Sequence, residues 1–316
     1  MVSLEDVRKA QERIENVIHK TPIITSSLLN ERCDLQIFLK AEHLQKTGSF
    51  KIRGATNAVK QAMAEGARFI TAASSGNHGQ AVAYIAGQLG IPAAIVVPKD
   101  ANRAKVEAIK AYGAKVEYCG TTSAERIPRA KQLAEDNSGI YIPPYDHPAV
   151  IAGQGTVGLE ILEQLPDIGA IVVPVGGGGL IGGILCAVKF LKPEVRVIGV
   201  EPETANDTFL SLQKGIITAI SGTSTIADGL RTSQPGDLTF PILREHLDEL
   251  VLVSETEIKE AFQFLLERTK QLVEPSGATA LAAVMSGKVS AANEKVAVVL
   301  SGGNIDLHQI PDFLNS

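Results

Sequence analysis

The sequence predicts an α/β protein built from parallel β-strands that alternate with α-helices. Two series of apolar strand segments and helical patterns follow one another, the first over residues 37–141 and the second over residues 149–300. An aromatic and proline-rich segment, Tyr141–Pro148, lies between the two series and indicates a crossing between domains. Strands that alternate with helices form right-handed βαβ units, and 316 residues are enough for about two domains.

The first series occupies the N-terminal half of the chain. Residues 4–18 place apolar side chains near one face and predict an amphipathic helix, whereas residues 21–27 are expected to be extended before a turn. Strands are expected at residues 37–40, 69–72, 93–97, 115–118 and 140–141, and helices at residues 55–64, 80–89, 102–112 and 123–136. We expect residues 69–146 to form a small domain, inserted into a large domain made of residues 1–68 and 147–316.

The second series completes the large domain. Helices are expected at residues 149–164, 180–191, 238–247, 255–269 and 277–286, and strands at residues 169–173, 195–200, 249–253 and 295–300. Residues 168–188 carry no charge and are long enough to cross a bilayer. Pro174 and the four glycines at 176–179 interrupt this stretch, so a strand, a glycine loop and a helix describe it better than a membrane span.

Composition excludes several classes of function. The net charge is −5 and no long basic run is present, so we expect no nucleic-acid partner. The three cysteines, Cys33, Cys119 and Cys186, lack metal-like spacing and fit free thiols in a reducing compartment. The N-terminus does not have the pattern of a signal peptide. These features predict a cytoplasmic protein without a membrane partner.

Lys51 is the first candidate for chemistry. It lies in the stretch Leu44–Gly54, after an apolar strand and near the start of a helix. A lysine is badly placed there for the helix dipole, which prefers negative charge at that end. The position suits a lysine whose nitrogen is bonded to another group, such as pyridoxal phosphate (PLP). An exposed surface lysine is the alternative.

A glycine loop, Gly176–Gly179, joins a strand to a helix. Bare amides at a helix N-terminus bind phosphate, which favours the phosphate of a small cofactor. The same residues offer a second interpretation, because Gly177, Gly179 and Gly182 satisfy the dinucleotide fingerprint and Glu201 follows about 20 residues later. A structural turn is the third alternative.

Two further loops follow strands. Ser74–Gly79 offers hydroxyl groups, an amide side chain and backbone amides at a helix start, which suit a carboxylate, although Ser and Asn are also ordinary helix caps. His78 in this loop is expected to be a packed or hydrogen-bonded histidine. Ser301–Asn304 follows an apolar strand, at the edge where α/β sheets bind ligands, and Ser301 suits a pyridine nitrogen. A tight turn explains that loop equally well.

These motifs, together with Glu274–Gly277, occur in one order along the chain. In that order they resemble the serine racemase and serine/threonine dehydratase family of PLP enzymes, which have fold type II, the tryptophan synthase β-like fold. The likeness covers nearly the whole chain. The resemblance implies that Lys51 forms the imine with PLP and that Ser75 acts on the opposite face of the substrate. The implied cofactor-binding residues are Phe50, Lys51, Asn77, Gly176, Gly177, Gly178, Gly179, Leu180, Gly229, Glu274 and Ser301.

The resemblance also implies how substrate and effectors bind. The substrate carboxylate would bind Ser74, Ser75, Gly76, Asn77 and His78, with help from Arg126. Two matches point to the serine racemase branch: Arg126 itself, and a divalent-metal loop in which Glu201, Ala205 and Asp207 would hold Mg, Mn or Ca. Ser26, Ser27, Lys46, Thr47, Gln80 and Tyr112 match the positions that bind ATP as an effector in animal racemases. In contrast, Tyr145–Pro148 resembles the bacterial dehydratases.

The implied activity is racemisation of serine combined with dehydration of L-serine and L-threonine, which gives D-serine, or a keto acid such as pyruvate plus ammonia. The alternative within the family is a threonine, serine or 3-hydroxyaspartate dehydratase with little racemisation. An NAD-linked oxidoreductase rests on the glycine fingerprint, and a non-catalytic amino-acid sensor is the binding-module alternative. Both leave Lys51 without a role. We expect a homodimer.

Overall fold

A computed structural model describes residues 2–101, 103–290 and 294–314. The larger of its two sheets has six strands in the order β1-β2-β10-β7-β8-β9. These strands are β1 (Ile23–Ile24), β2 (Gln36–Lys40), β7 (Ala170–Pro174), β8 (Arg196–Pro202), β9 (Glu249–Val253) and β10 (Lys295–Val299). Only the pair β1–β2 is antiparallel, and the other neighbours pair in parallel, as in the register Val298↔Val172.

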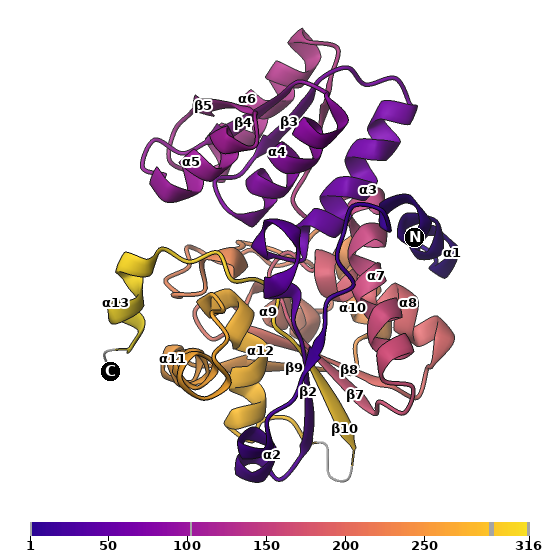
Figure 1. Ribbon diagram of the computed structural model, residues 1–316, viewed down its shortest axis with the longest axis vertical. Helices are drawn as coiled ribbons and strands as arrows, with labels where there is room; N and C mark the ends of the chain where they lie inside the picture. Colours follow the sequence, from indigo (N-terminus) through magenta and orange to yellow (C-terminus); the bar gives the residue numbers. More distant parts are fainter. Residues whose placement is uncertain (1, 102, 291–293, 315–316) are drawn as a thin grey trace.

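The smaller sheet contains four parallel strands in the order β5-β4-β3-β6. They are β3 (Ile70–Ala73), β4 (Ala93–Val97), β5 (Lys115–Tyr118) and β6 (Ile140–Tyr141). Figure 1 shows this sheet and its helices above the larger sheet, with α3 and α7 running between them. The predicted fold class, two mostly parallel sheets flanked by helices, is therefore confirmed.

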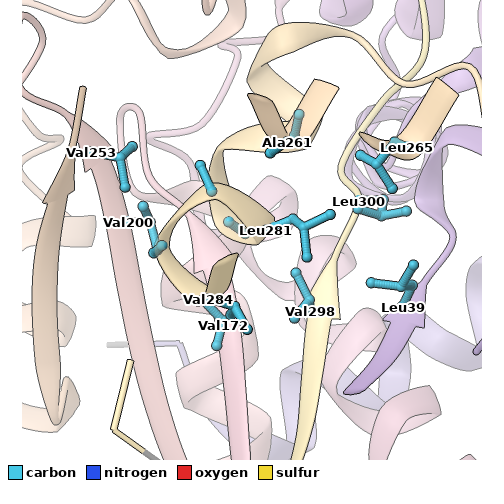
Figure 2. Packing of buried hydrophobic residues seen from close by; sticks show 14 of the residues in the cluster. Leu39, Val172, Val200, Val253, Ala261, Leu265, Leu281, Val284, Val298 and Leu300 are labelled. Carbon is cyan, nitrogen blue, oxygen red and sulfur yellow. The ribbon is translucent and has the colours of Figure 1, made fainter. Parts of the chain in front are cut away.

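Helices cover both faces of the larger sheet because its strands are apolar on both sides. Val172 and Val298 point to a core shared with α11 and α12, whereas Val173 and Val299 point to a second core under α1, α7 and α8. Figure 2 shows the first core, in which Leu281 of α12 lies among side chains of the central strands. The helices are α1 (Leu4–Ile14), α2 (Ser27–Cys33), α3 (Lys51–Ala64), α4 (Asn77–Leu89), α5 (Arg103–Ala111), α6 (Ser123–Asp136), α7 (Pro148–Gln164), α8 (Gly179–Leu191), α9 (Asp207–Lys214), α10 (Thr239–His246), α11 (Glu255–Phe264), α12 (Pro275–Met285) and α13 (Ile310–Leu314).

Several elements differ from the prediction. The helix predicted over residues 4–18 ends at Ile14, where the Lys60 ammonium donates to the Arg13 carbonyl and so satisfies one of the last carbonyls of α1. Helices α2, α9 and α13 were not predicted, because segments of five to eight residues carry too little periodicity. The helix predicted over residues 255–269 is α-helical only to Phe264 and continues as a π-helix, Leu265–Thr269. Asn102, the predicted start of another helix, lies outside the described residues.

A third hydrophobic core belongs to the smaller sheet. It combines Ile70 and Ile95 of the strands with Ile52 and Val59 of α3 and Val150 of α7. Residues on both sides of the predicted 68/69 and 146/147 boundaries therefore share one core, and the division into domains stays a prediction. No helix in the described part of the chain is long and apolar enough to cross a membrane.

Candidate active site

Lys51 is the first residue of α3, directly after the N-cap residue Phe50. Its Nζ donates a hydrogen bond of 2.7 Å to the carbonyl oxygen of Pro144 and lies 5.1 Å from the centre of the Phe50 ring. Burial lowers the pKa of the Lys51 amine to about 8, although the nearby Glu274 carboxyl opposes that shift. A lysine with a lowered pKa is partly neutral near physiological pH, which is the form that attacks a carbonyl carbon.

The turn before Lys51 is fastened to the loop after β10. Phe50 N donates to Ser301 O at 3.1 Å, and Gly303 N donates to Gly48 O at 2.9 Å. Ser49 and Gly302 form an antiparallel bridge between these two hydrogen bonds. The structure thus brings the predicted Lys51 and Ser301 segments together at the carboxyl end of the larger sheet.

Asn77 connects the second loop to this site. It begins α4, and its Nδ2 donates to Glu274 Oε1 at 2.6 Å. Asn304 Nδ2 donates to Asn77 Oδ1 at 2.8 Å and to Thr47 O at 2.6 Å, which fixes the orientation of the Asn77 amide. Burial, together with the Asp228 carboxylate, raises the pKa of Glu274 to about 8. The sequence analysis assigned no role to Asn304, although it lies in a motif that the analysis singled out.

The Ser74–Gly79 loop requires glycine for a close packing contact. A Cβ atom on Gly79 would lie 2.0 Å from the carbonyl oxygen of Ser74, and Gly76 N donates to Ser74 Oγ at 3.2 Å. His78 is buried, and its Nε2 lies 2.8 Å from the carbonyl oxygen of Ile142. Burial, together with the Lys51 ammonium, lowers the pKa of His78 to about 3. His78 is therefore neutral, and Nε2 carries the proton that it donates to Ile142 O.

Neutral His78 predicts a pH dependence of stability. In the unfolded chain a histidine binds a proton below about pH 6.5, whereas folded His78 stays neutral down to about pH 3. At this site the unfolded state then binds more protons in this window, so the contribution of His78 to the free energy of unfolding falls as pH falls from 6.5, by roughly 2 kcal/mol at pH 5. Urea unfolding of the cofactor-free protein at pH 5 and pH 7 measures this fall. The fall due to His78 is the part of the difference between the two pH values that His78→Gln removes and that His308→Gln, at an exposed position, keeps; the same difference in both variants would contradict the assignment.

The glycine loop enters α8 through a left-handed residue, Gly178, with φ of +87°. A Cβ atom added to Gly178 would lie 2.8 Å from Thr239 Oγ1, and one added to Gly177 would lie 2.4 Å from the Tyr145 ring. Only glycine therefore fits at these two positions. Thr239 Oγ1 also donates to Gly177 O at 2.7 Å. The first amides of α8, including that of Leu180, have no partner within the helix and suit a phosphate. The predicted cradle therefore fits the PLP phosphate.

Two residues that shape this loop, Tyr145 and Asp146, were not predicted from the sequence to do so. Tyr145 covers Gly177 and Gly179, and burial raises its pKa to about 12. Asp146 accepts hydrogen bonds from the amides of Asp237 and Leu238 near the start of α10, which holds Tyr145 in place. The aromatic and proline-rich composition of Tyr141–Pro148 was the available signal, and it was assigned to a domain crossing and to a resemblance with the bacterial dehydratases, but not to the glycine loop.

A pocket of about 200 Å³ lies beside Glu274 and is also lined by Asp228, Asn304 and Lys105. Lys105 Nζ of α5 contacts Asp228 Oδ2 at 2.6 Å, which joins the smaller sheet to the segment that contains Gly229. The carbonyl oxygen of Gly229 lies within 3.4 Å of the position that a Cβ atom on Gly176 would occupy. Gly229 therefore borders the glycine loop, as expected for a residue that lines the cofactor.

Arg126 lies in the first turn of α6, and its hydrogen bonds are local. Its guanidinium donates to Thr121 O at 2.9 Å and to Ser123 Oγ at 3.1 Å, and burial lowers its pKa. The structure shows no hydrogen bond from Arg126 to the Ser74–His78 loop in the described chain. Its role at the substrate carboxylate stays a prediction.

Glu201 and Asp207 form a buried carboxylate pair near the end of β8. Burial, together with the Asp207 carboxylate, raises the pKa of Glu201 to about 8, and burial raises the pKa of Asp207 to about 7. Among the described residues, no group of three or more His, Cys, Asp and Glu side chains is placed to hold a metal ion. Two buried carboxylates that repel one another, with the buried backbone of Ala205 in the same loop, fit a hard cation whose other ligands are water and a carbonyl.

The six predicted nucleotide positions do not form one site within a single chain. Ser26 is the N-cap of α2 and Ser27 its first residue, whereas Gln80 lies on α4. Figure 1 draws α2 and α4 at opposite ends of the molecule. Tyr112 packs edge-on against Tyr84, with ring centres 5.3 Å apart, next to the smaller sheet. Lys46 and Thr47 form the turn before Lys51, and Thr47 has φ of +61°.

The fold and the site together define an α/β enzyme of PLP fold type II. A family profile described as "Pyridoxal-phosphate dependent enzyme" matches residues 14–302. The chain belongs to this family, and PLP is the family's cofactor. A human serine racemase is 46% identical over 314 residues, which cover 97% of this chain and 92% of that protein.

Relatives named as threonine dehydratases have nearly the same sequence identity to this chain as the serine racemases. The catabolic L-threonine dehydratase TdcB of Escherichia coli K12 is 44% identical over 312 residues, or 98% of this chain and 95% of that protein. Among solved structures, maize serine racemase superposes with a TM-score of 0.94 at 38% identity, covering 98% of this chain and 96% of the other. The dinucleotide alternative finds no support here. The Glu201 carboxylate accepts the amide protons of Thr208 and Phe209 at the start of α9.

Proposed function

We propose that the protein is a serine racemase that also acts as an L-serine and L-threonine ammonia-lyase. The observation that carries the proposal is the Lys51 amine, whose pKa is lowered by burial and which lies near Glu274, the carboxyl group that accepts from Asn77. Similarity to racemases and dehydratases at 44–46% identity supports both activities. A threonine, serine or 3-hydroxyaspartate dehydratase with little racemisation is the second candidate. The segment Tyr145–Pro148 favours it, because this segment resembles the bacterial dehydratases.

PLP, when bound, supplies an electron sink that stabilises negative charge on the substrate α-carbon. Amides at the Ser74–His78 loop and the start of α4 bind the substrate carboxylate and orient the α-hydrogen. Asn304 donates to Asn77 Oδ1, and one N–H of Asn77 Nδ2 donates to Glu274, so the second N–H would donate to the cofactor's phenolic oxygen. Ser301, which is 3% exposed, would accept or donate a hydrogen bond at the cofactor's pyridine nitrogen.

Two residues move protons in this proposal. Neutral Lys51 Nζ takes the α-proton of L-serine on one face, and Ser75 Oγ gives a proton to the opposite face, which yields D-serine. In the elimination Lys51 takes the α-proton, and the β-hydroxyl leaves as water with a proton that the Lys51 ammonium returns to it. The released enamine tautomerises to an imine and takes up one water, which gives pyruvate and ammonia.

One incubation tests the function. With L-serine as substrate, D-serine and pyruvate are assayed together, and L-threonine is offered separately for conversion to its keto acid. Formation of D-serine with pyruvate supports the proposal. Keto acid without D-serine would support the second candidate, and neither product from either substrate would overturn both.

We also propose a divalent-cation site at Glu201, Ala205 and Asp207. A cation bound only in the folded state raises stability by about 2.7 kcal/mol at 100 times its Kd. Thermal unfolding should therefore shift upward on addition of Mg²⁺, Mn²⁺ or Ca²⁺, and Asp207→Asn should abolish the shift. Glu203→Gln, at an exposed position of the same loop, is the matched control and should retain it. A shift that survives Asp207→Asn would contradict the site.

Two further expectations concern the homodimer and the binding of ATP. ATP is proposed as an effector that binds between two chains of a homodimer, since one chain does not bring Ser26 and Gln80 together. Sedimentation of the protein with and without ATP tests both parts. A monomer that binds ATP with all six residues required would contradict this arrangement.

A further inference from the structure

Four buried charged side chains lie behind Lys51 and are called the ion quartet here: Lys40, Glu42, Arg53 and Glu160. Lys40, Glu42 and Arg53 are fully buried and Glu160 is 6% exposed. They come from three parts of the fold, namely the end of β2 with the turn after it, the first turn of α3, and α7. Two cations and two carboxylates make the quartet neutral overall.

Arg53 uses all five of its N–H donors inside the quartet and its surroundings. Nε and Nη2 donate to the two Glu42 oxygens at 2.8 and 2.7 Å. Nη1 and Nη2 donate to the two Glu160 oxygens at 2.7 and 2.9 Å, and Nη1 also donates to Thr156 Oγ1 at 3.1 Å. Two bidentate carboxylate pairs on one guanidinium fix its plane in three dimensions. A lysine at this position has only three donors and lacks the fork, the planar pair of N–H groups that binds a carboxylate in bidentate fashion.

Lys40 completes the quartet with hydrogen bonds that, among the described residues, go to α7 and to Thr21. Its Nζ donates to Glu160 Oε2 at 2.6 Å, to Gln164 Oε1 at 2.8 Å and to Thr21 O at 2.9 Å. It therefore has the same burial and the same carboxylate partner as Arg53. This makes Lys40 a matched control for the general cost of disturbing a buried charge.

Stability alone does not explain why the quartet is present. Burying a charge costs several kcal/mol, and a well-packed apolar replacement is often as stable as a buried ion pair. What an apolar replacement lacks is directional hydrogen bonding that holds one element at a fixed place. Arg53 follows Lys51 by two positions, so the two side chains leave α3 on nearly opposite sides. Arg53 thus anchors the helix turn from behind while Lys51 points to Pro144 O.

The same turn of α3 is pressed against α7. A Cβ atom on Gly54 would lie 2.5 Å from Gln154 Nε2, and one on Gly153 would lie 2.6 Å from the Gly54 Cα. Gly54 N also donates to Gln154 Oε1 at 3.2 Å. The first turn of α3 therefore has contacts that permit little displacement, and Arg53 supplies the charged part of that constraint.

We propose that Arg53, held by Glu42 and Glu160, is a positioning residue that sets where Lys51 presents its amine to the cofactor and substrate. The inference rests on the proposed function of Lys51. Loss of the fork lets the first turn of α3 shift, and a displacement of about 1 Å at a reacting group costs roughly 100-fold in rate. KM changes little, because the substrate carboxylate binds another loop.

The test compares Arg53→Lys with Lys40→Met in PLP-loaded protein. Three quantities are measured: the melting temperature, kcat and KM for L-serine, and the pH titration of the visible absorbance of bound PLP. Arg53→Lys should lower kcat by roughly 100-fold with KM within about 3-fold, and should shift the midpoint of the absorbance titration. Lys40→Met should lower the melting temperature at least as much and leave kcat and the midpoint near their original values.

Two outcomes overturn the inference. In the first, Arg53→Lys keeps the wild-type kcat and the wild-type midpoint of the absorbance titration. In the second, kcat and the midpoint change in both variants in proportion to the decrease in melting temperature. If Arg53→Lys does not fold, Glu42→Gln replaces it, because that change removes one bidentate partner and must produce the same shift and loss of kcat. Failure of the proposed function is distinguishable, since wild-type protein would then convert no L-serine or would show no visible absorbance from PLP bound to Lys51.

Discussion

Replacing Lys51 with alanine is expected to abolish both racemisation and elimination, lowering kcat by roughly 10⁴-fold or more. Lys51 has two roles in the proposal, because it attaches the cofactor and then takes the α-proton. Its pKa of about 8 is suited to both, since the neutral amine is accessible near neutral pH. The measurements are both product rates and the PLP retained after dialysis.

Lys60→Met is the matched control for this change. Lys60 lies on the same helix, but its Nζ donates to Arg13 O at 2.7 Å and to Asn16 Oδ1 at 2.9 Å, away from the site. This variant should keep PLP and both activities. If Lys51→Ala retained a covalently bound cofactor after dialysis and turned over L-serine at the original rate, another residue would have to form the bond.

Replacing Ser75 with alanine is expected to separate the two activities. Racemisation and D-serine dehydration should fall by about 10²–10⁴-fold, the usual contribution of one general acid or base. L-serine dehydration needs only Lys51 on its face of the substrate, so it should fall by less than roughly 10-fold. Initial rates with each enantiomer, followed by pyruvate formation and by D-serine assay, give the comparison.

Ser74→Ala controls for damage to the loop. Ser74 Oγ accepts the Gly76 amide, so its loss should weaken carboxylate binding for both enantiomers alike and appear mainly in KM. The contrast between the two variants separates proton transfer from substrate binding. Equal losses on L-serine and D-serine in Ser75→Ala would remove Ser75 from acid–base catalysis.

The features that were predictable from the sequence are local. Lys51, the Ser74–Gly79 loop, Gly176–Gly179 and Ser301 each lie where a strand ends or a helix begins, and glycine or hydroxyl residues mark such turns within a few positions. The alternation of strands and helices likewise fixed the fold class, because each element carries its own periodicity.

The features that the sequence did not disclose depend on contacts between distant segments. Lys40 and Glu160 are separated by 120 positions, and nothing near either residue marks it as a buried partner of the other. Tyr145 packs on the glycine loop and Thr239 donates a hydrogen bond to it, yet nothing in either segment indicates that it contacts residues 176–179. Short helices such as α9 also escaped, since eight residues barely exceed two turns.

The most direct test of the account is the identity of the residue that carries the cofactor. Borohydride reduction of the PLP-loaded protein, followed by proteolysis and mass spectrometry, reports which lysine becomes covalently modified. The account predicts a single pyridoxyl-phosphate adduct on Lys51, in the peptide that also contains Phe50 and Arg53 if cleavage after the modified lysine is blocked. An unmodified Lys51, or an adduct confined to another lysine, would contradict it.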